Sequence, residues 1–147
     1  MNTTEISQLR RQTGASFIAC AQALRSFPKI ADAIASLIAS GQAKADRLNA
    51  RQTQCGRLFS YVHTDGLKGS ALVLLCETDF VARNEEFIQL GNDLAMQLTV
   101  FKVGSVDELL CSPFIKDPTT KIRDRLSTTK ASLGENIRIG RFECFQV

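Results

Sequence analysis

Apolar residues recur at helical spacing in three short runs within about the first forty residues, and turn signals separate these runs. Gly14 ends the first run, Ser16 is a typical N-cap for the second, and Pro28 precedes the third. Gly41 is expected to end the third helix. The pattern predicts a three-helix bundle over residues 1–41. Because so short a bundle is marginally stable by itself, we expect it to pack against the rest of the chain.

A β-hairpin is predicted after a polar stretch. Residues 42–56 are polar and rich in turn formers, which predicts either a linker or an extension of the third helix. The alternation over residues 58–63 predicts one strand, and the apolar run over residues 70–77 predicts a second strand that is buried on both faces. The turn residues 64–69 between them join the two strands as a hairpin.

Helices and a closing strand are predicted in the remaining sequence. Asn84 is a typical N-cap for one helix, and a later helix is expected to end at Gly134. The final residues alternate again, with a break at Gly140 that indicates a β-bulge. Since an isolated hairpin is marginal in water, we expect this strand to join it as a third. The predicted fold is α+β: a bundle over 1–41, a linker over 42–56, and a core domain over 57–147 with a small three-stranded antiparallel sheet and helices packed on one side.

Composition and charge argue against several classes of function. The chain is 44% apolar and 22% charged, as is typical of a globular protein. Its formal net charge is +3, and lysine and arginine are scattered along the chain, so direct binding to nucleic acid is not expected. No apolar stretch approaches the ~18 residues that span a membrane, and the N-terminus lacks the apolar segment of a signal peptide. We therefore expect a soluble intracellular protein without a membrane partner.

Candidate chemistry is scarce. The 5 cysteines are widely spaced without a CxxC pair, and His63 is the one histidine, so no metal site is expected. The cysteines are interpreted as small apolar residues in a reducing compartment. The sequence offers no nucleophile beside a base and no phosphate-binding loop. We therefore expect no catalytic residue, no cofactor and no enzymatic activity, with His63 in a structural role.

One loop stands out, in the stretch CETDFVARNEEF over residues 76–87. Thr78, Asp79, Phe80 and Val81 connect the apolar strand to the next helix, and such connections lie on the surface and often carry function. Two interpretations are open. Phe80 folds under and packs on its own helix, or Asp79 and Phe80 project outward as an aromatic anchor beside a charge, ready for a partner.

The same stretch closely resembles the signature of elongation factor Ts, the guanine-nucleotide exchange factor for elongation factor Tu. Three further stretches resemble the family in the family's order, and together they cover nearly the whole chain. They are LRRQTGASFIACAQAL over residues 9–24, PFIKDP over residues 113–118, and LGENIRIGRF followed by ECF over residues 133–145.

The resemblance implies a mechanism and a partner. In this family the N-terminal module is a ubiquitin-associated-like (UBA-like) bundle that docks on the GTP-binding domain of elongation factor Tu, and the Thr-Asp-Phe-Val loop pushes into that domain near its magnesium site. Carried to this chain, Thr78, Asp79, Phe80 and Val81 form the loop, with Phe80 as the wedge and Asp79 disturbing the metal environment. The bundle residues implied in docking are Leu9, Arg10, Thr13, Gly14 and Ala15. The implied location is the bacterial cytoplasm or an organellar matrix or stroma.

The sequence departs from the family in two places. Residues 99–104 stand where the family carries an additional, mostly helical section, so the core is shortened there. Ala19 and the pair Ala21-Gln22 stand where relatives often have an acid and lysines, which makes docking less electrostatic. Short forms of the family are dimers, so a homodimer is one expectation. Two functions stay open: an active, minimal exchange factor, or a degenerate relative kept as a structural or binding component of a translation assembly.

Overall fold

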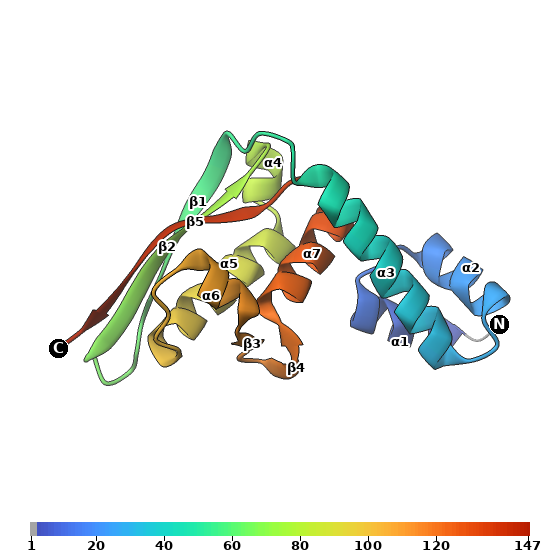
Figure 1. Cartoon of the computed structure of the whole chain (residues 1–147), viewed down its shortest axis with the longest axis horizontal. Coiled ribbons are helices and arrows are strands. Elements are labelled where there is room, and N and C mark those ends of the chain that lie inside the picture. Colours follow the sequence, from blue (N-terminus) through green and yellow to red (C-terminus); the bar gives the residue numbers. More distant parts are fainter. Residues whose placement is uncertain (1–2) are drawn as a thin grey trace.

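The computed structural model describes residues 3–147, and Figure 1 shows a sheet with its helices on one side and a helical bundle beside them. The N-terminal bundle consists of α1 (Thr3–Thr13), α2 (Phe17–Ser26) and the first half of α3 (Ile30–Leu48). Ser16 caps α2, because its hydroxyl accepts a hydrogen bond from the Ala19 amide at 3.2 Å. The predicted three-helix bundle is confirmed. Its buried core is formed by Ile6, Leu9, Cys20, Ala21, Ala23, Ala33 and Leu37.

The predicted end of the third helix at Gly41 is wrong, because α3 continues to Leu48. Its second half packs along α7 (Ile122–Leu133), where Ala45 and Leu48 are buried. The Lys44 ammonium also donates a hydrogen bond to the Ala131 carbonyl at 2.6 Å. The long helix therefore joins the bundle to the core, and the polar connection shrinks to residues 49–54. The division into separate domains stays a prediction.

The sheet is three-stranded and antiparallel, in the order β1 (Cys55–Val62), β2 (Lys68–Cys76), β5 (Arg138–Gln146). This confirms the predicted hairpin and the predicted third strand. Leu74 pairs with Ile139 and Leu72 pairs with Phe142, so two residues of β5 lie opposite the single residue Val73. The bulge predicted at Gly140 is therefore present.

Helices cover one face of this sheet. The helix α5 (Glu85–Val100) lies across β1 and β2, and it is joined by α7 and the short helix α6 (Val106–Cys111). A short hairpin of β3 (Pro113–Phe114) and β4 (Asp117–Lys121) leads into α7. Phe59 on β1 contacts Phe87 on α5 with ring centroids 6.0 Å apart, and Gly91 leaves room for the Phe59 ring. The predicted α+β fold, with helices on one side of the sheet, is confirmed.

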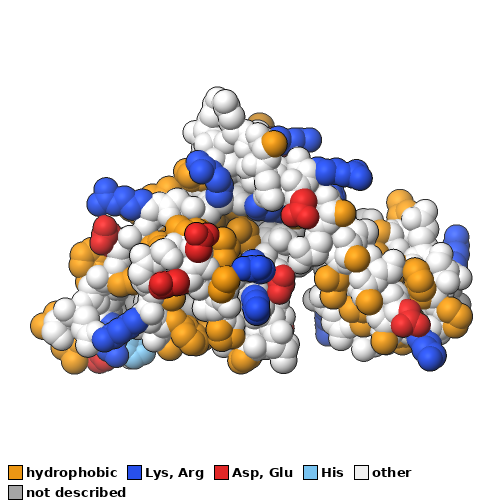
Figure 2. Space-filling model, viewed as in Figure 1, with side chains coloured by type: hydrophobic (Ala, Val, Ile, Leu, Met, Phe, Trp, Pro, Cys, Tyr) orange, Lys and Arg blue, Asp and Glu red, His pale blue; other side chains and the backbone are white. Residues whose placement is uncertain are grey.

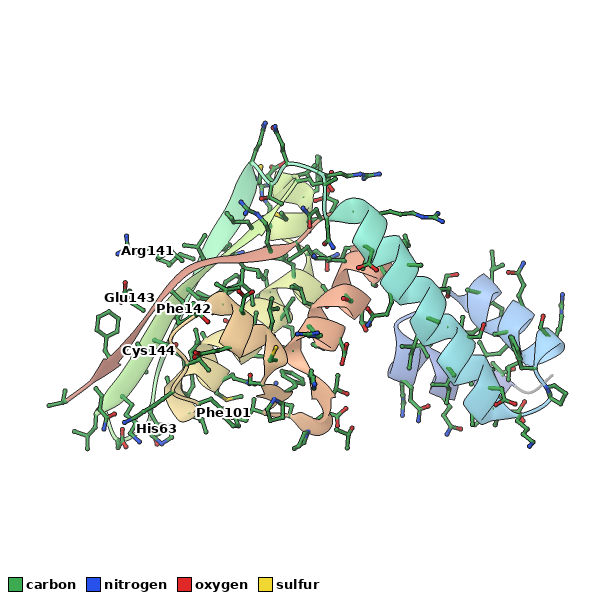
Figure 3. All side chains as sticks on the ribbon, in the orientation of Figure 1. His63, Phe101, Arg141, Phe142, Glu143 and Cys144 are labelled. Atoms are coloured by element: carbon green, nitrogen blue, oxygen red, sulfur yellow. The ribbon has the colours of Figure 1, made fainter. Side chains whose placement is uncertain are left out.

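The prediction that the second strand is buried on both faces is wrong. Burial along β2 alternates, with Leu72, Leu74 and Cys76 buried under the helices and Val73 and Leu75 half-buried on the other face. An apolar run cannot tell these two faces apart, whereas in the structure the buried residues of α5, α6 and α7 form one core with Leu72, Leu74 and Cys76 on a single face of the strand. Leu58, Val62 and Phe145 are exposed apolar residues of the sheet. In Figure 3, Arg141 and Glu143 of β5 lie away from the helices, whereas Phe142 packs against the core.

Candidate partner-binding site

The loop singled out in the sequence forms a single helical turn, α4 (Asp79–Ala82), directly after β2. Thr78 is its N-cap, and the Thr78 hydroxyl accepts a hydrogen bond from the Val81 amide at 3.4 Å. Val81 and Ala82 are buried and belong to the core under the sheet. The turn is therefore anchored at both ends, which leaves Asp79 and Phe80 between two fixed points.

Phe80 projects into solvent with 83% of its surface exposed, which makes it the most exposed phenylalanine within residues 3–147. The alternative that it packs under its own helix is wrong. Asp79 is also exposed, and its carboxylate forms an ion pair with Arg83 at 3.0 Å across one helical turn. Since a large apolar ring gains nothing from water, a rigid turn that presents it outward is suited to burial against a partner.

Val81 is buried, unlike Asp79 and Phe80. Its side chain is 9% exposed and packs into the core, where it anchors the turn, and its role in partner binding stays a prediction. Thr78 is half-buried, and both its amide and its hydroxyl donate hydrogen bonds to Glu135. Of the four loop residues, the structure therefore exposes the side chains of Asp79 and Phe80.

Cys76, the last residue of β2, supports the start of the loop from inside the core. Its thiol donates a hydrogen bond to the Thr78 carbonyl at 3.1 Å. Burial, with smaller contributions from the Glu135 carboxylate and from Cys55, raises the pKa of the Cys76 thiol to about 11. At neutral pH the group is therefore a protonated donor and not a reactive thiolate.

The bundle residues implied in docking separate into surface and core. Leu9 has no exposed surface and lies in the bundle core, so its side chain packs inside the bundle, and its role in partner binding stays a prediction. Arg10 and Gly14 are exposed, and Thr13 and Ala15 are half-buried. Gly14 ends α1 in a left-handed conformation with φ of 64°, which glycine adopts without strain. The structure thus brings four of the five implied residues to one surface around the end of α1.

Two further residues of the bundle surface were missed. Phe17 and Ile18, in the first turn of α2, are 51% and 68% exposed. The buried residues of α2 are Cys20, Ala21 and Ala23, so Phe17 and Ile18 lie outside the core of the bundle. The sequence did carry a signal for them. A helix that packs through one apolar stripe needs one large apolar residue in its first turn, and here two such residues follow the N-cap directly.

The surface offers little for other kinds of ligand. On the face in Figure 2, lysine and arginine side chains are dispersed and not gathered into one patch. Within residues 3–147, no three His, Cys, Asp or Glu side chains are grouped so that they could hold a metal ion. His63 is exposed and lies 3.4 Å from the Tyr61 hydroxyl. No helix in the described part of the chain has the length and apolar character needed to cross a membrane.

Two exposed apolar sites, the Phe80 ring on its anchored turn and the side chains of Phe17 and Ile18 on the bundle, are features of a protein-binding module. Comparison with known proteins specifies the family. The sequence model of the family "Elongation factor TS" matches residues 77–147, which include the turn, α5, α7 and β5. The chain is similar over more of its length to individual curated members of that family.

Three such relatives show how far the similarity extends. Elongation factor Ts of Oleidesulfovibrio alaskensis is 34% identical over 188 aligned positions, which cover 97% of this chain and 95% of the relative. Elongation factor Ts of Thermodesulfovibrio yellowstonii is 34% identical, with 97% and 94% covered. The chloroplastic elongation factor Ts of Phaeodactylum tricornutum is 31% identical, with 93% and 91% covered.

The chain belongs to the elongation factor Ts family, and it is a translation elongation factor of that family. The first alignment spans more positions than the 147 residues of this chain, so the relative has residues that this chain lacks. The placement of the deletion at residues 99–104 stays a prediction.

Proposed function

We propose that this protein is a guanine-nucleotide exchange factor that promotes release of GDP from elongation factor Tu. The observation that carries the proposal is the exposed ring of Phe80 on a turn anchored by Thr78 and Val81. Family membership supports the choice of partner. A relative kept for a structural role has no need of such a ring, which favours exchange over the alternative of a binding component in a translation assembly.

The proposed mechanism involves no covalent chemistry. Tight nucleotide binding, nanomolar for example, corresponds to ~12 kcal/mol, and much of it depends on Mg²⁺ and on backbone amides that hold the phosphates. An exchange factor binds best to the nucleotide-free, metal-free conformation of its partner. Because binding is reciprocal, the factor lowers the partner's affinity for nucleotide as many fold as nucleotide lowers the partner's affinity for the factor. Phe80 enters a crevice of the GTP-binding domain, and Asp79 brings a carboxylate near the metal.

The N-terminal bundle supplies a second contact with the same domain. The residues that support this proposal surround the end of α1 and the start of α2: Arg10, Thr13, Gly14, Ala15, Phe17 and Ile18. Because Ile18 is 68% exposed, Ile18→Asp places a charge in the contact without entering the bundle core. We expect calorimetric titration to show at least about tenfold weaker binding to elongation factor Tu with an unchanged melting temperature. Equal affinity would contradict docking through this surface.

The uncovered face of the sheet supports association with a second copy of the chain. Val73 and Leu75 are half-buried there, and Leu58 is 66% exposed. An apolar sheet face of this kind is stable in water when another surface covers it. We expect a homodimer in sedimentation experiments and a monomer for Leu58→Asp, which changes an exposed position. A parent protein that sediments as a monomer at all concentrations would exclude this association.

Release of fluorescent GDP from elongation factor Tu, measured with and without this protein, tests the proposed function. We expect faster release that increases with the protein's concentration. A stable complex without faster release would favour the alternative of a structural component. The bacterial and chloroplastic relatives support a location in the bacterial cytoplasm or in an organellar matrix or stroma. We propose no cofactor and no direct contact with nucleic acid.

A further inference from the structure

Glu135 lies in the turn between α7 and β5, and its carboxylate contacts the segment just before α4. One oxygen, Oε2, accepts hydrogen bonds from the backbone amides of Glu77 at 3.2 Å and Thr78 at 3.1 Å. The other oxygen, Oε1, accepts a hydrogen bond from the Thr78 hydroxyl at 2.6 Å. Three donors that are distant in sequence therefore converge on one side chain.

The hydroxyl bond is the informative one, because Thr78 is also the N-cap of α4. A hydroxyl has one proton to donate and lone pairs to accept with. When the Thr78 proton is directed to Glu135, the same oxygen is left to accept the hydrogen bond from the Val81 amide at 3.4 Å. Glu135 thus sets the orientation of the cap, and the cap sets the direction in which Phe80 leaves the turn.

The carboxylate of Glu77, just before α4, makes the reciprocal contact with the segment that contains Glu135. Glu77 accepts a hydrogen bond from the Asn136 amide at 2.6 Å, so Glu77 and Glu135 each hold the backbone of the other's segment. The side-chain amide of Asn136 in turn donates to the Arg51 carbonyl at 2.7 Å. Figure 1 shows the connection between α3 and β1, the start of β5 and α4 meeting at this end of the sheet. The loop is therefore held to the segment that leads from the bundle.

We propose that Glu135 is the positioning residue for Phe80, holding the Thr78 cap so that the ring is presented to elongation factor Tu in the inserting orientation. This rests on the proposed function. Among the ion pairs of residues 3–147, none involves Glu135, so neutral donors hold its carboxylate in place. A carboxylate that satisfies two amides and a hydroxyl at once is replaced poorly by a carboxamide, whose nitrogen can accept none of these bonds.

A double-mutant cycle separates positioning from mere stabilisation of the fold. We expect Glu135→Gln to lower the rate of GDP release at saturating concentrations of this protein by about tenfold. In the Phe80→Ala background the same substitution should change the rate less than about twofold, because there is no ring left to orient. Glu108→Gln is the matched control, since Glu108 also accepts a backbone amide bond, from Gly104 at 2.8 Å, away from the loop.

The outcomes are distinguishable. If the parent protein does not accelerate GDP release, the proposed function fails. If the parent is active and Glu135→Gln equals it, or loses the same factor with and without Phe80, the positioning role is overturned. Should Glu135→Gln unfold at the assay temperature, the cycle is run with Thr78→Val, which removes the hydroxyl from the same hydrogen bond and carries the same expectation.

Discussion

Replacing Phe80 by alanine separates the folding role of this side chain from its role in binding. With 83% of its surface exposed, the residue keeps roughly one sixth of its surface in contact with the protein. For a side chain that buries 150–250 Å² when fully enclosed, this is about 25–40 Å², worth at most about 1 kcal/mol of stability at ~25 cal/mol per Å². Alanine is the better helix former by about 0.5 kcal/mol, which offsets part of the loss.

The melting temperature of Phe80→Ala should therefore fall by less than about 4 °C, at 2–4 °C per kcal/mol for a chain of this size. Phe87→Ala is the matched control, because Phe87 is a fully buried aromatic in the same stretch. Its loss should cost ~3–5 kcal/mol and lower the melting temperature by roughly 10 °C. The two variants carry the same chemical change, so their difference measures burial alone.

The binding role of Phe80 appears in the rate of GDP release from elongation factor Tu. Burying the ring in a partner's crevice should be worth at least ~2 kcal/mol, as for an interface hot spot. Because each ~1.4 kcal/mol is a factor of ten, the rate at limiting concentrations of this protein should fall more than tenfold. A Phe80→Ala protein that melts early yet releases nucleotide at the parent rate would refute the reasoning and show that the ring has a structural role.

Three further changes test other parts of the account. Asp79→Asn should slow GDP release less than Phe80→Ala does, and the loss should shrink when Mg²⁺ is chelated; a loss independent of Mg²⁺ would argue against a role at the metal. Leu74→Asp buries an unpaired charge under the helices and should unfold the protein, whereas a cooperative melt near that of the parent would contradict the strand assignment. The Cys76 thiol, with its pKa raised from 9.0 to about 11, should lower the free energy of unfolding by about 2–3 kcal/mol as pH rises from 9 to 11, because the unfolded chain releases the proton first. Chemical denaturation at several pH values should show that the free energy of unfolding of Cys76→Ala falls less steeply with pH than that of the parent. An equal pH dependence in the two proteins would show that the thiol does not cause the loss of stability.

The sequence by itself determined the elements and most of their order. Helical spacing, the Ser16 and Asn84 caps and the glycine after α7 are local signals, and the structure contains the corresponding helices. The alternation in the hairpin and in the closing strand is local too, and the bulge at Gly140 follows from its break. These features were predictable because backbone geometry and side-chain period are set by residues a few positions apart.

The candidate site was predictable in part. The stretch around Phe80 marked the loop, since a large aromatic among charges at the end of an apolar strand is unusual for a chain that needs only to fold. The same local signal could not separate Val81 from Phe80, although one is 9% and the other 83% exposed. Burial of a loop residue depends on what packs beneath it, and for Val81 that is the core formed by α5 and the sheet.

Tertiary structure decided the remainder. Helix α3 passes Gly41 because α7, some eighty residues later, offers a surface that buries Ala45 and Leu48. One face of β2 stays less covered because the buried residues of α4, α5, α6 and α7 all pack with Leu72, Leu74 and Cys76 on the other face. Glu135 meets Thr78 because strand pairing brings the start of β5 beside the end of β2. Contacts of this kind join residues that no local pattern relates, and their free energy exists only once the chain has closed the loops between them.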